Sequence, residues 1–267
     1  MPNNLRIFDN NLCGGTAVTI AVNSAAISLP GNNALNPNRR KTWRTAIGTT
    51  TGTAVIDMGA AKDWNVLAIV SGNIGTAGTV TIQGGTADSW VAPAYNSGAL
   101  AAYDDDYTGV MLFWLGSTKT LRYCRVILDD PGNADNYLDV GVLWLGTYTA
   151  MERNFSYGWE IEPVSLSNTA YAVDGTPYTD EMDEYRRFQL DFKFLTEEFA
   201  VRTFLPLVNR VAIKRDVIMA LFPERRTDEG TAIEHSLNFY GRIEGPRTRN
   251  TSSWRWGASL SFRETPR

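Results

Sequence analysis

Residues 34–73 constrain the fold of this chain more than any other stretch. The segment begins with a polar, basic loop that ends at Trp43 and continues through a Gly/Thr-rich break. A short apolar run, Ala54 to Met58, then stops at Gly59, and a continuous apolar run extends from Trp64 to Val70. Runs of this length between turn residues are typical of β-strands, and the second predicts a strand buried on both faces. The stretch therefore predicts a β-sandwich that presents loops.

The rest of the first 150 residues repeats this pattern. Short apolar or alternating segments are separated by Gly- and Pro-rich turns, and no helical periodicity is present, which favours a sandwich or barrel. These further expected strands are residues 5–8, 17–22, 79–83, 110–115, 119–128 and 137–145.

Four motifs in residues 1–148 resemble the galactose-binding, or discoidin-like, jelly roll. They are the loop that ends in Trp-Arg at 43–44, Val-Ile-Asp-Met-Gly at 55–59, Val-Leu-Ala-Ile-Val-Ser-Gly-Asn at 66–73, and Arg-Tyr-Cys-Arg-Val-Ile-Leu at 122–128 with its return strand Leu-Asp-Val-Gly-Val-Leu-Trp-Leu-Gly at 138–146. The resemblance implies a jelly-roll domain over residues 1–150. The family's terminal disulfide does not transfer, because Cys124 lies inside a strand. Its ligand residues lie in variable loops and do not transfer either.

A second domain is expected over residues 151–267, where charged residues are about twice as dense. Asp174-Gly175 is a hairpin turn signal, and residues 178–184 form an acidic stretch expected to be a surface loop. Strands are expected at 217–222, 236–243 and 253–262, and Thr196 is the expected N-cap of one helix that Pro206 should kink or end. Two alternating strands should each bury one face, Phe188, Leu190, Phe192 and Phe194 in the first and Trp254, Trp256, Ala258, Leu260 and Phe262 in the second. The pattern predicts an antiparallel β-barrel or sandwich with one packed α-helix.

This order of elements, ending in Trp-Arg-Trp-Gly-Ala-Ser-Leu-Ser-Phe-Arg-Glu at 254–264, is similar to the barrel-plus-helix domains of bacteriophage tail-tube and distal-tail subunits. The resemblance is topological. It implies a virion structural protein of the tail tip or baseplate that is assembled in the host cytoplasm. Such proteins act as homo-oligomeric rings among other phage tail proteins.

Charge and cysteine content exclude several classes of protein. Residues 1–150 hold nine basic and eleven acidic side chains, and residues 151–267 hold sixteen and eighteen, so neither half is a basic nucleic-acid platform. No apolar run approaches the roughly 20 residues of a membrane helix, and the N-terminus has no signal-peptide apolar region. A cytoplasmic chain is expected to keep Cys13 and Cys124 reduced, with a disulfide as the alternative.

The chain offers little chemistry for catalysis. His235 is the only histidine, there is no G-x-S-x-G elbow or P-loop, and His/Cys metal sites are not credible with one His and two distant Cys. Asp104, Asp105 and Asp106 are adjacent and cannot converge on one cation from an extended chain. A glycosidase pair of carboxylates stays open, because no pair stands out. We therefore expect no enzyme, cofactor or metal.

Two sets of residues are candidates for binding. The run Arg39, Arg40 and Lys41 is either a solvated loop or an interface patch for an acidic surface such as residues 178–184. The aromatic set either stacks on sugar rings or covers the ends of the barrel; it comprises Trp90, Tyr95, Tyr103 and Tyr107. The leading hypothesis is the structural virion protein. The alternative is a carbohydrate-binding module for host-surface glycan, and a third interpretation is an accessory of a cell-wall hydrolase.

Overall fold

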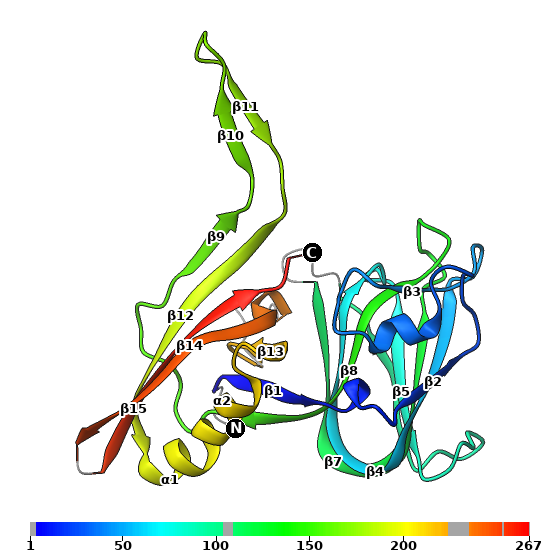
Figure 1. Cartoon of the computed structure of the whole chain (residues 1–267). Helices are drawn as coiled ribbons and strands as arrows, with labels where there is room; N and C mark the ends of the chain where they lie inside the picture. Colours follow the sequence, from blue (N-terminus) through cyan, green and yellow to red (C-terminus); the bar gives the residue numbers. More distant parts are fainter. Residues whose placement is uncertain (1–3, 104–108, 224–234, 253, 267) are drawn as a thin grey trace. The chain divides into compact units, whose positions relative to one another are not determined.

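The computed structural model describes residues 4–103, 109–223, 235–252 and 254–266, and within them the chain is mainly β (Figure 1). It divides into two compact units. The jelly-roll unit comprises residues 10–149 with 235–238, and the sheet–helix unit comprises residues 4–9, 150–223 and 239–266. The first residues thus differ from the domain predicted over 1–150: they belong to the second unit, because β1 (Arg6–Asn11) pairs there with β13 (Val217–Ala220).

The jelly-roll unit is an antiparallel sandwich whose two layers share two long strands, β4 (Thr51–Gly72) and β7 (Val110–Asp129). One layer has the order β2-β4-β7-β5-β6, and the other has β3-β8-β4-β7. The remaining elements of the unit are β2 (Thr19–Val22), β3 (Trp43–Arg44), β5 (Thr79–Gly85), β6 (Tyr95–Ala101), β8 (Asp139–Ala150) and the 3-10 turns Leu12–Gly14, Gly31–Leu35 and His235–Leu237.

Each long strand replaces two strands that the sequence predicts. Gly59 and Gly116 look like strand ends, yet both lie inside a strand, with φ of 74° and 71°. The β4–β7 register shifts between Asp57 and Lys62 and again after Trp64, so both strands bend there and pass from one layer to the other. Glycine permits this because it adopts positive φ without a Cβ clash.

The core of the jelly-roll unit lies between its layers. The largest of its fully buried side chains are Trp43 and Trp64, and burying such a side chain contributes about 1.5–3 kcal/mol. The indole nitrogen of Trp43 donates to the Ser24 carbonyl at 2.9 Å. Cys13 and Cys124 are buried free thiols in the same core. The segment 34–73 is therefore framework, as the apolar runs within it predict.

The sheet–helix unit is built on an antiparallel sheet of order β1-β13-β14-β15-β12-β9. Its additional strands are β9 (Ile161–Ser165), β12 (Glu184–Thr196), β14 (Asn238–Ser252) and β15 (Arg255–Glu264), and β10 (Asn168–Tyr171) pairs with β11 (Pro177–Asp180) in a separate two-stranded sheet. Arg186 and Glu264 join β12 to β15 through a buried bidentate ion pair of 2.5 and 2.6 Å.

One helical stretch packs against this sheet. It comprises α1 (Glu197–Phe199), a π-helical turn (Ala200–Phe204) and α2 (Leu205–Val211). Thr196 is the N-cap, as predicted, and its hydroxyl accepts from the Phe199 amide at 3.2 Å. Pro206 does not end the helix; it follows the π turn, which is where helices absorb such local disruption. Phe204 contacts Phe192 of the sheet at 6.3 Å between ring centroids. None of the described helices has the length and apolarity to cross a membrane.

A β-bulge changes the predicted face of β12. Phe188, Leu190 and Phe192 are buried as expected, but the pairing with β15 shifts between Phe192 and Leu195. Phe194 has φ of 64° and is 52% exposed, while Leu195 takes its place in the core. Alternation alone could not predict this, because a bulge inserts one residue and reverses the faces beyond it.

Candidate functional site

The basic run at 39–41 is only partly a surface patch. Arg39 is 2% exposed, and its Nε donates to the Ser71 hydroxyl at 2.6 Å inside the jelly-roll unit. Arg40 and Lys41 are exposed. The prediction that Arg39 contributes to an interface patch is therefore corrected: it supports the loop, because a buried guanidinium requires hydrogen-bond partners.

Two of the predicted stacking aromatics cover the core of the jelly-roll unit. Tyr95 packs edge-on against Trp64, with ring centroids 6.1 Å apart, and burial raises its pKa. Tyr103 packs against the same core, and its hydroxyl accepts a hydrogen bond from the Leu112 amide. These contacts match the interpretation of the tyrosines as covers for the ends of the barrel. Tyr107 and the acidic trio at 104–106 lie outside the described residues.

Trp90 lies apart from those tyrosines, near the outer face of the layer that contains β5 and β7. Its indole nitrogen donates to Asp88 at 2.6 Å, and the guanidinium of Arg125 lies 4.7 Å from its ring centroid. The Nε of Arg125 donates to Gln83 at 2.7 Å, and desolvation lowers the pKa of the Arg125 guanidinium. Tyr95 pairs with Gly84 and faces inward. The aromatics thus do not form one platform.

A hollow lies on the face of the sheet–helix unit formed by β12, β15 and β14. Its floor is β15, where Gly257 has no side chain and Ser259 and Ser261 have small ones. Its walls are longer side chains of the flanking strands, Arg187, Gln189, Asp191 and Lys193 on β12 and Glu244, Arg247 and Arg249 on β14. We call this surface the trough.

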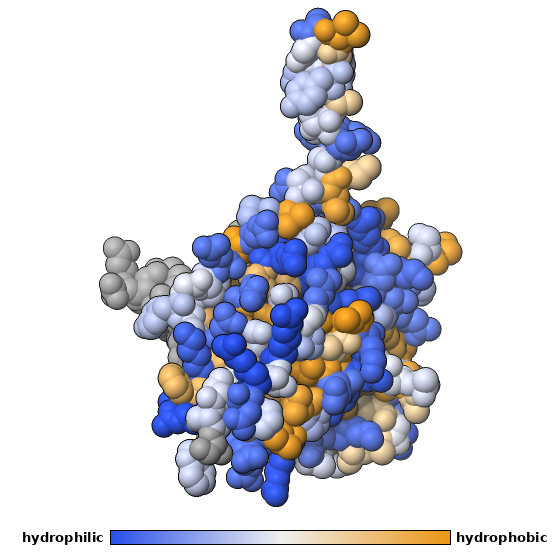
Figure 2. Space-filling model, turned by 60° about the vertical axis from the view of Figure 1, so that its left-hand side comes forward, coloured by the Kyte–Doolittle hydropathy of each residue, from blue (hydrophilic) through white to orange (hydrophobic). Residues whose placement is uncertain are grey.

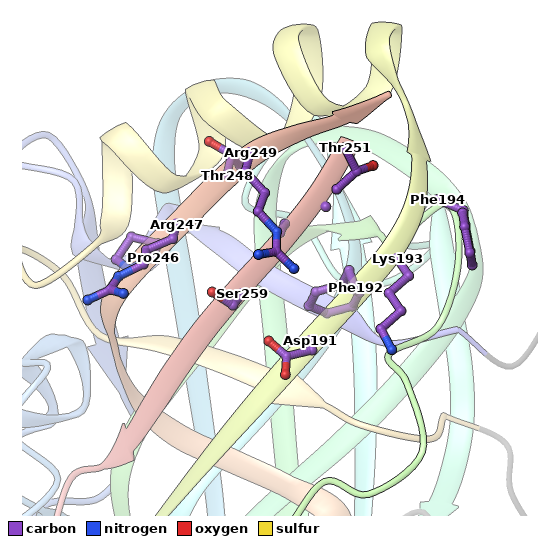
Figure 3. A pocket seen from close by; sticks show the side chains of 12 residues that line it. Asp191, Phe192, Lys193, Phe194, Pro246, Arg247, Thr248, Arg249, Thr251 and Ser259 are labelled. Carbon is purple, nitrogen blue, oxygen red and sulfur yellow. The ribbon is translucent and has the colours of Figure 1, made fainter. Parts of the chain in front are cut away.

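Strand register explains the shape of the trough. Ser259 pairs with Asp191 on one side and with Arg247 on the other, and Gly257 pairs with Arg249. Because alternate residues of a strand share a face, long and short side chains line up in rows. Figure 3 shows the wall side chains on either side of Ser259, with Arg249 extending over the middle strand. The hollow at this end has a volume of about 790 Å³.

The end of the trough near Ser259 is positively charged. Lys193, Arg247 and Arg249 line it against one carboxylate, Asp191. Among the residues that the structure describes, the charged groups of these three cations form no hydrogen bond or ion pair. Phe194 also lines this hollow, and the guanidinium of Arg255 lies 5.1 Å from its ring centroid. The trough therefore offers unneutralised cations beside an exposed aromatic ring, which suits an anionic ligand with apolar parts.

Sequence reasoning identified the alternating strands but missed the trough. Lys193 lies more than fifty residues before Arg247 in the chain, and neither stands in a run of basic residues. Alternation in the sequence shows which side chains of one strand share a face. Only the pairing of β12 and β14 with β15 brings these rows of side chains together.

Residues 166–183 form a second distinctive surface, which we call the acidic arm. The hairpin turn predicted at Asp174-Gly175 is confirmed: Gly175 has φ of 83°, and Asp174 Oδ1 accepts from the Thr176 amide at 3.0 Å. The predicted surface loop at 178–184 instead contains β11 and the start of β12. β10 and β11 have four residues each, and all of them are exposed.

The acidic arm combines negative charge with exposed apolar side chains. It contains four carboxylates, Asp174, Asp180, Glu181 and Asp183, and no Lys or Arg. Tyr171 is 74% exposed on one face of the ribbon, Tyr178 is 64% exposed on the other, and Val173 is fully exposed in the turn. Figure 2 shows this narrow projection, with hydrophobic and hydrophilic residues side by side at its tip.

No metal centre is present among the described residues, since no three His, Cys, Asp or Glu side chains there come close enough to hold an ion. The side chain of His235 lies outside the described parts of the chain.

Comparison with known proteins finds similarity only at the level of solved structures; no family model and no curated protein sequence matches the chain. A GH29 fucosidase from Ruminococcus gnavus in complex with fucose is 17% identical over 54% of this chain, with a TM-score of 0.43. The chain spans 28% of that fucosidase.

Two smaller proteins are similar over almost their whole length. Chitosan-binding module 1 of a Paenibacillus chitosanase/glucanase is 15% identical, with a TM-score of 0.41, over 52% of this chain and 99% of the module. The family 32 CBM from Clostridium perfringens NanJ in complex with galactose is 15% identical, with a TM-score of 0.40, over 54% of this chain and 99% of that one. At these values the likenesses carry no argument about what this chain binds.

Proposed function

We propose that this protein is a non-enzymatic structural subunit that assembles with copies of itself. The acidic arm carries this proposal. A two-stranded ribbon alone is at best marginally stable in water, yet all residues of β10 and β11 are exposed, including two tyrosines. Exposed apolar groups and unpaired strand edges of this kind mark surfaces that a partner covers.

We place this assembly in the tail tip or baseplate of a bacteriophage virion. What supports this placement is the resemblance, noted in the sequence, of the order strand, helix and further strands to tail-tube and distal-tail subunits. Its partners would be other tail proteins and neighbouring copies in a ring, with assembly in the host cytoplasm. The protein should then be detected in purified virions by mass spectrometry.

Shortening the acidic arm tests the assembly. Ser165 pairs with Glu184, so residues 166–183 can be replaced by Asn-Gly, which closes a two-residue hairpin. We expect the intact protein to sediment as an oligomer and the shortened protein as a monomer with a similar Tm. Intact protein that stays monomeric at high concentration, or shortened protein that assembles equally well, would sink the proposal.

The second candidate function is glycan recognition by the jelly-roll unit. Trp90 favours it, because its ring is held by Asp88 and Arg125 beside the amide of Gln83. Sugar recognition commonly uses a ring face together with planar hydrogen-bonding groups.

A glycan array compares the intact protein with Trp90→Ala and with Tyr103→Ala. We expect glycan binding to be lost in Trp90→Ala. Binding should be retained in Tyr103→Ala, because the native Tyr103 ring packs against the core. If the intact protein binds no glycan on the array, only the structural role remains.

A further inference from the structure

We propose that the acidic arm of one copy docks in the trough of a second copy of this chain. The inference rests on the proposed assembly function and names the surface at which it occurs. Three features of the sheet–helix unit support it: the complementary charges of the two surfaces, their shapes, and the direction in which the arm leaves its own sheet.

The charges of the two surfaces are complementary. The trough presents Lys193, Arg247 and Arg249 around Ser259, without ion-pair partners in the described chain. The acidic arm presents four carboxylates and no cation, and Asp180 and Glu181 form no ion pair with any described residue. Opposite patches of this kind steer association and fix its register.

The shapes of the two surfaces also match. The floor of the trough consists of glycine and serine residues of β15, which leaves a hollow between the longer side chains of β12 and β14 for side chains of the arm to enter. The arm presents one tyrosine on each face, so either face offers an aromatic ring to a groove. Phe194 at the edge of the hollow supplies an exposed apolar partner for such a ring.

The occupant is a second copy because an arm points away from the cationic end of its own trough. The arm leaves the sheet at the N-terminal end of β12, at Glu184. Lys193 lies nine residues further along that strand, which is about 30 Å in the opposite direction. Figure 1 shows β10 and β11 beyond one end of β12 and α1 at the other end. An arm would have to reverse its direction to reach the cationic end of its own trough.

Such a contact joins different surfaces of neighbouring copies. A head-to-tail contact repeats from copy to copy and closes into a ring when the rotation permits, or otherwise forms a filament. The structure thus supplies both halves of a repeating interface on one chain.

Charge reversal in two separate proteins tests the contact. The trough variant carries Lys193→Glu, Arg247→Glu and Arg249→Glu, and the arm variant carries Asp180→Lys, Glu181→Lys and Asp183→Lys. We expect each alone to lose at least ten-fold in association constant by sedimentation velocity. Mixed together, they should co-assemble, because each arm then meets a trough of opposite charge. Assembly should weaken as salt rises, because salt screens these exposed charges.

A matched control reverses three exposed cations on the helical side of the unit, Arg202→Glu, Lys214→Glu and Arg215→Glu. This control should assemble like the intact protein. A trough variant that assembles normally, while the shortened-arm protein is monomeric, would overturn the docking site and leave the assembly function standing. Two monomeric variants that fail to co-assemble on mixing would also overturn it. If the intact protein never assembles, both proposals fail.

Discussion

Single residues decide how much of this chain can react or bind. Cys13 and Cys124 are buried in the jelly-roll core. Burial raises the pKa of the Cys13 thiol from 9.0 to about 12, opposed by a hydrogen bond to the Leu145 backbone, and burial also raises the pKa of Cys124. Both groups are neutral thiols at physiological pH, because the thiolate is costly to desolvate.

We predict that neither native thiol of the folded protein is alkylated by iodoacetamide at pH 8, whereas both react in urea. The raised pKa also sets the direction of the pH dependence. The folded state binds the thiol proton more tightly, so the contribution of Cys13 to stability is complete below about pH 9 and is lost as pH rises towards 12. Urea midpoints of the intact protein and of Cys13→Ala, measured at pH 8 and pH 10.5, check this. A midpoint for the intact protein that falls no more than that of the variant would contradict it.

Phe194 adopts an unfavourable backbone conformation within the strand β12. A phenylalanine at φ of 64° is strained by about 1–3 kcal/mol, and the bulge places its ring in solvent rather than in the core. The strained backbone holds this exposed ring beside the cations Lys193, Arg247 and Arg249. We take this as support for a role of the ring in binding. The fold does not need a phenylalanine at this position, since the bulge turns Leu195 rather than Phe194 into the core.

At the scale of elements, we predict that Phe194→Gly keeps or raises the free energy of unfolding by up to about 1 kcal/mol, because glycine adopts this φ freely. It should nevertheless weaken assembly, because the ring at the edge of the trough is lost. Phe194→Ala is the matched control: it should weaken assembly equally but retain the backbone strain. Urea unfolding and sedimentation velocity measure the two effects. Normal assembly of both variants would remove Phe194 from the interface.

The elements also show what the sequence can predict. Most strand positions follow from apolar runs such as residues 66–70 and from alternation in residues 187–192, because burial on one or both faces leaves those patterns. The continuity of β4 and β7 did not follow, because Gly59 and Gly116 permit a bend or a stop equally well. Trp254 was expected to be inward but is 79% exposed, because β15 begins only at Arg255.

At the scale of the whole molecule, each unit has its own framework and its own candidate surface. The jelly-roll unit holds Trp90 and Arg125, and the sheet–helix unit holds the trough and the acidic arm. The sequence indicated the acidity of residues 178–184 and suggested a basic partner within the same kind of subunit. We predicted Arg39 to Lys41 as that basic partner because they are adjacent in sequence. The trough cations come together only through strand pairing, which a single sequence does not reveal.

Cross-linking between two single-cysteine additions tests the docking of arm into trough most directly. Thr179→Cys places a thiol on the exposed arm, and Ser259→Cys places one on the trough floor; the native thiols are buried and should not compete. When the two proteins are mixed and oxidised, we predict a disulfide-linked heterodimer on a non-reducing gel. Replacing Ser259→Cys with Asn209→Cys, on the exposed face of the helix, should give none. Equal cross-linking of Thr179→Cys to Ser259→Cys and to Asn209→Cys would contradict docking of the arm in the trough. So would the absence of cross-linking to Ser259→Cys in protein that is assembled.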